Sequence, residues 1–390
     1  MKFWLQVLIQ SVIFIISFST CFANEGIIFN RFRFSPELSI SEIYSDNVFL
    51  VDKDEASDSI TTVSPKLSVD FAISPEHFIT LSYGGDFRYY GRFDNFRQDI
   101  HHTNLSWTWN TSKGSKIRLG GKTDYDSIQP FSEADIQKDF VTTDVFADTL
   151  FKIWSYTDMA IKYDHIFRRF KDSGFEEDEF DSDSITVDIM YEYSPASALI
   201  VSYTYNHQDN NDISGTSNGM DTHIILAGAQ WKPTSRLSGR IQAGYYQTSL
   251  ENEIDSNGFA MDTDLTYRLS DFIQLKAAAF RKAVRSTAAA RETGDFYIST
   301  GGSFLASYRR WEPLIMSVSL AFMNNKFEQQ AGQINVNRKD DLYSISTNAE
   351  YFFTDRLSSI VSYHYRNNDS NFINESYKEN RVEAKLAFAF

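Results

Sequence analysis

A regular alternation of apolar and polar residues is the feature that most restricts the fold of this chain. Between Val63 and Ile73, apolar residues occupy every second position, and Ser, Lys, Asp and Ala fill the positions between them. A period of two places these two classes on opposite faces of a β-strand. The pattern recurs along the chain in segments suited to the roughly 9–11 residues that a tilted strand needs to cross a membrane. These segments include 79–89, 103–109, 117–125, 185–193, 199–205, 314–322 and 357–365.

Tight turns and longer polar loops alternate between these segments. Eight tight turns and nine longer loops predict eighteen antiparallel strands in up-and-down order, with both termini on the same side. Val141–Ile153 and Phe272–Ala283 show the weakest strand pattern, so a count of sixteen also remains open. The tight turns are expected at 74–77, 111–115, 154–156, 194–197, 232–235, 269–271, 310–313 and 353–355, and the longer loops include 46–59, 171–183, 208–219, 325–339 and 367–380.

A transmembrane barrel competes here with two soluble β folds. Turns that recur about every 40 residues are also found in β-propellers, but a propeller places four short strands in each repeat, whereas two long ones are predicted here. A soluble β-sandwich is the other alternative. Trp154 and Trp311 fall in predicted tight turns, where amphipathic rings suit a membrane boundary. We therefore expect an all-β protein whose residues 24–390 form a closed antiparallel transmembrane up-and-down β-barrel.

The N-terminal residues are typical of a cleavable secretory signal. Met1-Lys2 precedes an apolar stretch that ends at Phe18, and Cys21-Phe22-Ala23 offers small residues at the two cleavage positions. Residues 1–23 are therefore predicted to be a signal peptide, with an uncleaved anchor or a lipoprotein as alternatives. Because the single cysteine lies in this segment, the mature chain is expected to lack disulfides.

The C-terminal strand is typical of outer-membrane proteins. Leu386, Phe388 and Phe390 share one face of the last predicted strand, and Phe390 is the last residue of the sequence. A terminal aromatic residue preceded by apolar residues at every second position resembles the signal by which the outer-membrane assembly machinery recognises barrels. We expect these three residues to act as that assembly signal, and we expect the protein to be located in the bacterial outer membrane.

If the apolar residues at every second position of a strand face the lipid, the residues between them face the lumen. Most charged residues of the predicted strands fall in this second set. Barrels of 16–18 strands generally enclose an aqueous channel. Two interpretations remain open, namely a basic stripe that faces a polar solute or an acidic glycan, and cross-strand ion pairs within the wall. The lipid face is expected to carry no such charges, because they are costly there. The residues predicted to line the pore are Arg88, Lys116, Arg118, Lys122, Asp124, Lys152, Lys162 and Arg240.

No catalytic centre is predicted. The single local cluster among the seven histidines is His101-His102, near Asp94 and Asp99, and a proton-relay role for it remains an alternative. Neither a Ser-His spacing nor a metal-ligand spacing accompanies the cluster. The acidic segment Lys171–Asp183 admits divalent-cation binding, but a solvated charge run is the commoner explanation. We expect no metal, no cofactor and no enzyme activity.

Two segments near the start of the mature chain resemble a known family. Tyr44-Ser45-Asp46-Asn47 is followed by the strand segment Ile60-Thr61-Thr62-Val63-Ser64-Pro65. This order resembles the opening of the putative β-barrel porin 2 family, and more narrowly of outer-membrane proteins associated with exopolysaccharide and PEP-CTERM gene systems. The resemblance implies a role in exopolysaccharide secretion or passage, and it brings no catalytic residue with it.

We therefore expect a pore for exopolysaccharide secretion or for the passage of polar solutes. A general diffusion porin and a structural or adhesive barrel with a closed lumen remain the alternatives. The expected partners are outer-membrane lipids and lipopolysaccharide, the assembly machinery, a polysaccharide and periplasmic export proteins. Nucleic acid is not expected, because the net charge of −15 repels it.

Overall fold

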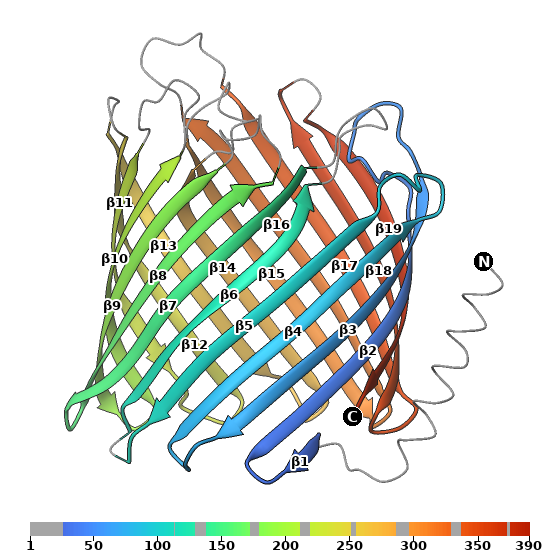
Figure 1. Cartoon of the computed structure of the whole chain (residues 1–390). Helices are drawn as coiled ribbons and strands as arrows, with labels where there is room; N and C mark the ends of the chain where they lie inside the picture. Colours follow the sequence, from blue (N-terminus) through green and yellow to red (C-terminus); the bar gives the residue numbers. More distant parts are fainter. Residues whose placement is uncertain are drawn as a thin grey trace.

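A single closed β-barrel makes up the fold (Figure 1). The computed structural model describes residues 26–112, 114–128, 138–171, 179–210, 219–250, 255–285, 296–328, 337–372 and 375–390. Eighteen long antiparallel strands, β2–β19, form the wall, which confirms the predicted fold class and excludes the count of sixteen. In the described part of the chain, no helix is long and apolar enough to span a membrane. The predicted signal peptide, residues 1–23, lies outside the described residues and stays a prediction.

The strands follow the order of the sequence around the barrel. Their bounds are β1 Ile27–Phe29, β2 Phe32–Ser45, β3 Asp58–Ala72, β4 His77–Tyr90, β5 Gln98–Asn110, β6 Lys116–Ile128, β7 Lys138–Trp154, β8 Thr157–Phe170, β9 Phe180–Ser194, β10 Ser197–Asn210, β11 Met220–Trp231, β12 Leu237–Leu250, β13 Ser256–Arg268, β14 Ile273–Arg285, β15 Phe296–Trp311, β16 Leu314–Glu328, β17 Lys339–Phe352, β18 Leu357–Ser370 and β19 Tyr377–Ala389. The short β1 was not predicted, and it pairs only with the beginning of β2.

Closure of the barrel comes from the pairing of the last strand with the first long one. Leu386 of β19 lies opposite Ile40 of β2, and Phe388 lies opposite Leu38. Each long strand therefore has a partner on both sides. Its backbone hydrogen-bonding groups are used within the wall, which is the condition for a β-structure in a membrane.

The two ends of the barrel differ. The eight predicted tight turns all join consecutive strands at one end, together with β1 and Phe390, and we call this the turn end (bottom of Figure 1). At the opposite end, the loop end, the predicted loop boundaries are wrong, because β9 already begins at Phe180 and β18 continues to Ser370. Polar residues on both faces remove the alternation there, but contacts such as Arg169 Nη2 to Asp181 Oδ2, 2.6 Å, still join the strands.

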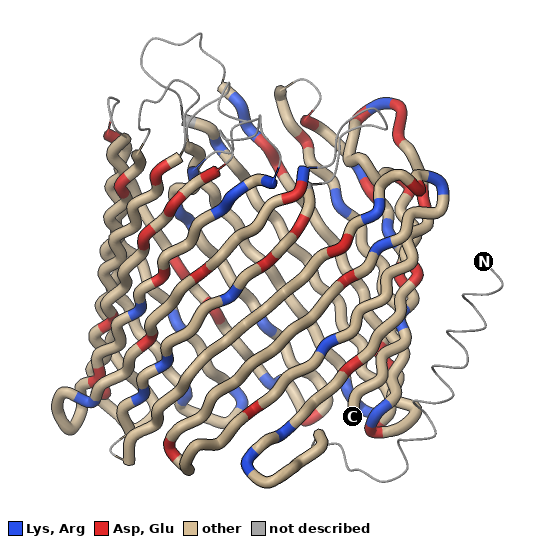
Figure 2. The backbone as a smooth tube through the Cα atoms, in the orientation of Figure 1, with Lys and Arg blue, Asp and Glu red and all other residues tan. Residues whose placement is uncertain are grey.

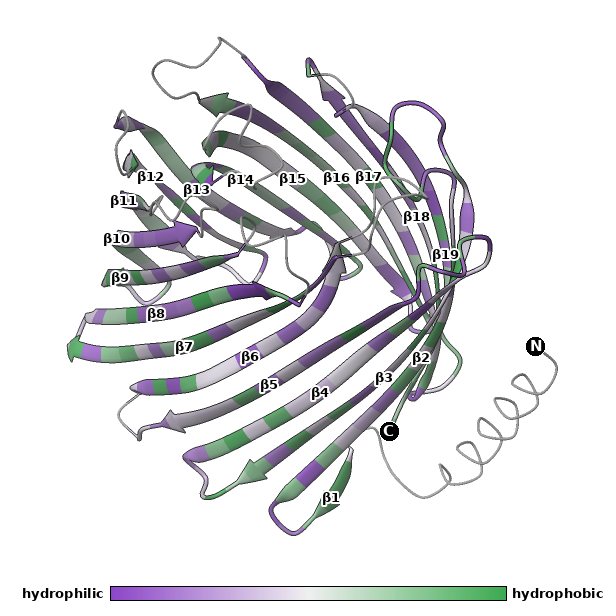
Figure 3. Cartoon of the chain, turned by 45° about the horizontal axis from the view of Figure 1, so that its top comes forward, coloured by the Kyte–Doolittle hydropathy of each residue, from purple (hydrophilic) through white to green (hydrophobic). Residues whose placement is uncertain are grey.

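Hydrophilic and hydrophobic residues alternate along many strands (Figure 3), and charged residues recur along them (Figure 2). Successive side chains of a strand lie on opposite faces, so the two faces of the wall differ chemically. Leu81 and Leu105 lie opposite each other on β4 and β5, and their side chains are 50% and 55% exposed. Residues of the other parity, from β2–β6 and β17–β19, together line a cavity of about 800 Å³. That parity therefore faces the lumen, and the exposed apolar face is the outside of the barrel.

The backbones of β11 and β12 approach each other closely at two glycines. A Cβ atom added to Gly228 would overlap the backbone oxygen of Ile241, and one added to Gly244 would overlap that of Ile225. Both glycines have the lumen-facing parity, opposite Gln242 and Leu226. Only glycine permits so close an approach of the two backbones.

Candidate functional site

The predicted pore residues all occupy the lumen-facing parity of their strands. On β6 and β7, for example, Arg118 lies opposite Asp148 and Lys122 opposite Asp144. Val145, the neighbour of Asp144, points outward and is 47% exposed. The register places Arg88, Lys116, Arg118, Lys122, Asp124, Lys152, Lys162 and Arg240 on this inner face. Whether they line a conducting path stays a prediction.

Several of these charges are paired across neighbouring strands. Arg118 donates from Nε to Asp148 Oδ2 at 2.8 Å, and Lys122 Nζ lies 3.5 Å from Asp144 Oδ2. Both cations also stand over the ring of Phe146, at 4.8 and 5.3 Å from its centroid. These contacts have the geometry of cross-strand ion pairs within the wall, which is the second of the two interpretations drawn from the sequence.

Other predicted lumen residues have different partners. Lys152 Nζ lies 3.8 Å from Asp158 Oδ1, and Asp124 Oδ1 lies 2.7 Å from His102 Nδ1. Arg88 donates to Gln98 Oε1 at 3.2 Å. For Lys116 and Lys162 the described residues offer no hydrogen bond or ion pair.

A second polar network lies on the inner face of β9–β12. The carboxylate of Asp188 accepts a hydrogen bond from Ser202 Oγ at 2.5 Å, and Gln242 Nε2 donates to the same hydroxyl at 2.8 Å. Arg240 Nε donates to Gln242 Oε1 at 2.5 Å. Asp188, Ser202 and Gln242 are buried. The hydrogen bond from Arg240 to Gln242 therefore orients the guanidinium through this buried network.

The cavity of about 800 Å³ lies along the inner wall of β2–β6 and β17–β19. Some charged residues that line it are already paired, such as Lys66 with Glu37 at 3.1 Å. Three others, Asp86, Glu350 and Lys385, take part in no hydrogen bond or ion pair within the described residues. Among the described residues, these three side chains thus have no hydrogen-bond or ion-pair partner that a solute in the cavity would have to displace.

The loop end is narrowed from inside by the loop that connects β2 and β3. Val48 and Phe49 of this loop pack against Ile43 and Ile60, which are lumen-facing residues of β2 and β3. Phe93 and Phe96, from the connection after β4, join the same apolar cluster. We call this cluster the rim cluster. Most residues of the longer loops predicted at 171–183 and 325–339 lie outside the described ones.

A second inward displacement involves β15. Pairing between β13 and β14 is confined to Met261–Arg268 and its partners, so the two strands separate toward the loop end. There Phe296 and Ile298 of β15 pack with Tyr246, a lumen-facing residue of β12, in one buried cluster. The loop end of β15 therefore lies against the inner face of β11–β13.

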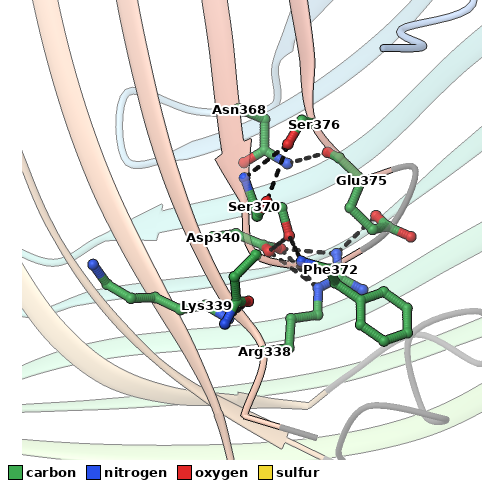
Figure 4. A network of polar contacts seen from close by, with 9 residues as sticks. Arg338, Lys339, Asp340, Asn368, Ser370, Phe372, Glu375 and Ser376 are labelled. Atoms are coloured by element: carbon green, nitrogen blue, oxygen red, sulfur yellow. Dashed lines mark hydrogen bonds and ion pairs between the residues drawn. The ribbon is translucent and has the colours of Figure 1, made fainter. Parts of the chain in front are cut away.

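A third cluster at the loop end centres on a buried guanidinium (Figure 4). Arg338 donates to both carboxylate oxygens of Asp340, at 2.8 and 3.1 Å, and to Glu375 at 2.7 Å. Its guanidinium also lies over the ring of Phe327, at 4.5 Å. Burial alone would lower the pKa of Arg338, but its contacts with Asp340 and Glu375 raise the pKa above its ordinary value. The charge of Arg338 thus stays fixed and ties β17 to the connection between β18 and β19.

The Tyr-x-Asp-Asn segment adds side-chain contacts to the seam between β2 and β19, a role that the sequence alone did not indicate. Both carboxylate oxygens of Asp46 accept hydrogen bonds from Asn380, from its backbone N–H and its side-chain amide, each at 2.7 Å. Asn47 is fully buried and donates from Nδ2 to the backbone oxygens of Lys378 and Val51. Asp46 and Asn47 therefore join the first loop to β19 at the seam.

The residues of the predicted assembly signal lie at the turn end of the same seam. Leu386 is 48% exposed on the outer face, and the rings of Phe388 and Phe390 meet edge to face at 4.7 Å. The backbone N–H of Phe390 donates to Pro36 O at 3.1 Å. Their recognition by an assembly machinery stays a prediction.

Two expectations about histidines and charges need correction. His101 and His102 do not form a cluster, because they alternate between the two faces of β5: His102 meets Asp124 in the lumen, whereas His101 forms a hydrogen bond with Tyr83 outside. The outer face is also not free of charge. At the loop end, outside the apolar band, Asp183 and Asp221 share the outward parity of Ile185 and Ile225.

The described residues contain no group of three or more His, Cys, Asp or Glu side chains arranged to hold a metal ion. The acidic segment considered for divalent cations, Lys171–Asp183, falls largely outside the described residues, since 172–178 are not described.

Comparisons with known proteins match this architecture. A family model described as Putative beta-barrel porin 2 matches residues 175–390, which is more than half of the chain and does not include the Tyr44–Pro65 segments. No curated protein sequence matches.

Three solved structures illustrate the similarity in fold. The siderophore receptor PirA from Pseudomonas aeruginosa has a TM-score of 0.51 and 9% identity, over 91% of this chain and 80% of that one. The copper transporter OprC has a TM-score of 0.53 and 10% identity, over 94% and 82%. OpdK from Pseudomonas aeruginosa, solved with vanillate, has a TM-score of 0.50 and 11% identity, over 92% and 99%. At these identities the similarity concerns the fold alone.

Proposed function

Because the chain belongs to the Putative beta-barrel porin 2 family, we propose that it is a pore of the bacterial outer membrane and not an enzyme. The observation that carries this proposal is the lumen cavity of about 800 Å³, lined by charged side chains, inside a wall whose outer face is apolar. An apolar band outside and a polar interior are the pattern of outer-membrane channels. The folds of OprC and PirA, described as a transporter and a receptor, are compatible with this location.

The solute that suits this cavity is polar and carries hydrogen-bonding groups. Asp86 and Glu350 provide carboxylates and Lys385 an ammonium group, and none of the three has a partner among the described residues. Such side chains can replace part of the hydration shell of a passing solute. A polysaccharide, with its many hydroxyl groups, meets this requirement, and we propose exopolysaccharide passage as the specific role. A general diffusion porin remains the second candidate, because small polar solutes meet the same requirement.

Planar-bilayer conductance of the purified protein tests the pore. We expect single-channel steps, and we expect neutral and acidic oligosaccharides to block them when they enter the lumen. Block by neither oligosaccharide would favour the diffusion porin, whereas no conductance would contradict both pore roles and favour a closed structural barrel. Deletion of the gene should reduce extracellular polysaccharide, and unchanged output would contradict the export role.

The ion selectivity of the channel tests the cavity itself. Lys385→Gln should shift the reversal potential in a salt gradient toward cation selectivity, because an unpaired ammonium group in the lumen is removed. Lys232→Gln is the matched control, because Lys232 is exposed in the turn between β11 and β12. Equal reversal potentials for the two variants would show that the cavity does not lie on the ion path.

A further inference from the structure

The outer face of β8–β11 carries a row of alternating histidines and aspartates at the loop end. The register places His165 opposite Asp183, Asp183 opposite His207, and His207 opposite Asp221. These four residues, which we call the His–Asp row, follow one line across four neighbouring strands. All four side chains are substantially exposed, between 35% and 44%.

The row consists of two copies of the same arrangement. Tyr163 donates from its hydroxyl to Asp183 Oδ1 at 2.7 Å, and His165 Nδ1 lies 2.9 Å from the same oxygen. On the next pair of strands, Tyr205 donates to Asp221 Oδ1 at 2.7 Å, and His207 Nδ1 lies 2.9 Å from it. In both copies the tyrosine and the histidine are two residues apart on one strand, and the aspartate is on the next.

These contacts determine what the row offers to a ligand. Since Nδ1–H of each imidazole faces a carboxylate oxygen, the neutral ring keeps its lone pair on Nε2. All four contacts use Oδ1 of Asp183 or Asp221, so Oδ2 of each aspartate takes no part in them. The row thus presents mainly hydrogen-bond acceptors, and it requires a partner that donates.

The position of the row identifies the kind of partner. Toward the middle of the barrel the same face carries Ile185, Val201 and Ile225, which are exposed and apolar. Arg169 and Asp181 pair with each other on the opposite side of the row. The row therefore lies at the boundary between an apolar band and a charged end, which in a membrane is the level of the lipid head groups.

We propose that the His–Asp row binds the saccharide head group of an outer-leaflet glycolipid. Sugar hydroxyls are donors, whereas a bare phosphate is an acceptor and would meet two carboxylates. With neighbouring strands about 4.8 Å apart, the row extends over about 14 Å. A sugar head group presents several hydroxyls over that length, whereas the ammonium group of phosphatidylethanolamine has its three N–H donors at a single point. The inference rests on the outer-membrane location proposed above.

The test uses the full-length barrel, folded in detergent and examined by native mass spectrometry. It is titrated with rough lipopolysaccharide, with phosphatidylethanolamine and with the free core oligosaccharide released from the same lipopolysaccharide. We expect retention of lipopolysaccharide and weak binding of the other two. His165→Phe with His207→Phe, and separately Asp183→Asn with Asp221→Asn, should each lower this retention about tenfold, which corresponds to about 1.4 kcal/mol, since each removes hydrogen-bond acceptors of the row.

The matched control is Asp124→Asn, which alters the same type of contact with His102 on the lumen side of β5 and β6. It should leave lipopolysaccharide retention unchanged. Heat-dependent mobility on a gel verifies that each variant is folded. Retention by both row variants, or loss in the lumen control, overturns the inference, and so does preferential binding of phosphatidylethanolamine.

Conductance of the same preparations separates the two proposals. A wild-type barrel that conducts but retains no lipopolysaccharide overturns the glycolipid site and leaves the pore intact. A barrel that retains lipopolysaccharide but does not conduct supports the site and contradicts the pore.

Discussion

At the scale of single residues, a few side chains far apart in the sequence hold the barrel closed. Asp46 and Asn47 reach Asn380 and Lys378, more than 330 positions away in the chain. Nearby, Ser45 Oγ donates to the buried carboxylate of Glu379, which also accepts from Arg366 Nε at 2.7 Å. Removing one member of so buried a network leaves its partners unsatisfied, which costs more than the bond itself.

Asp46→Ala with Asn47→Ala is therefore expected to lower the free energy of unfolding by about 2–4 kcal/mol, since several buried groups lose their partners. Urea titration of the barrel in lipid vesicles measures this change. Asp52→Asn serves as the control, because Asp52 is exposed in the same loop. A double variant as stable as this control would show that the seam does not depend on the two residues.

Glycine is required where the backbones of β11 and β12 approach each other closely. Gly244→Ala places a methyl group on the backbone oxygen of Ile225, and we expect a loss of about 1–3 kcal/mol of stability, as for other overpacked sites. Gly121→Ala is the control, because its added Cβ meets only ordinary van der Waals contact, 3.5 Å from Asp144 O. The same urea titration compares the free energies of unfolding of the two variants. Equal values would show that β11 and β12 can move apart at Gly244 without loss of stability.

At the scale of elements, strands extend beyond the apolar band, and β13 and β14 separate there. The pairs between β13 and β14 end near Met261, and the loop end of β15 packs on the inner face of β11–β13 through Phe296 and Ile298. This end of β15 stays paired with β14 and β16, where Phe296 lies opposite Arg285 and Glu328, and hydrophobic contact holds it against the inner wall. The strand pattern at 272–283 is weak because small residues such as Ala277 and Ala279 leave little alternation in hydropathy.

Phe296→Ala should release this end of β15 from the inner wall. Loss of a buried phenylalanine costs about 3–5 kcal/mol in a core, so local opening should become more frequent. Hydrogen exchange of the amides at 296–300 measures the effect, and we expect faster exchange there than in the middle of β15. Phe304→Ala, on the outward face of the same strand, should leave these amides protected. Equal protection in both variants would contradict the proposed role of Phe296.

At the scale of the whole molecule, the loop end is narrower than the strand count alone indicates. The rim cluster, the displaced end of β15 and the cluster around Arg338 all involve lumen-facing residues at this end. The unpaired charges of the cavity lie on the wall formed by β2–β6 and β17–β19. A solute that crosses the barrel therefore meets a rim that is partly apolar and a wall that is polar.

Replacing residues 48–56 by a short Gly-Ser segment should widen this rim, because it removes the loop part of the rim cluster and keeps Asn47. We expect a larger single-channel conductance, measured in planar bilayers at the same salt concentration. In the control, only the exposed residues 52–55 are replaced by Gly and Ser. This control leaves Val48, Phe49 and Ala56 in place. Unchanged conductance in the larger replacement would show that the rim cluster does not limit the channel.

The sequence by itself determined the barrel, a strand number of eighteen or sixteen, the face of the wall on which the predicted pore residues lie and the positions of the turns. Alternation with a period of two is a local property, and it specifies which side chain faces which side wherever one face is apolar. Only the tertiary structure decided the seam at Asp46 and Asn47, the inward course of the rim cluster and the His–Asp row. These depend on which distant strands become neighbours, and at the loop end, where both faces are polar, no local pattern records that pairing.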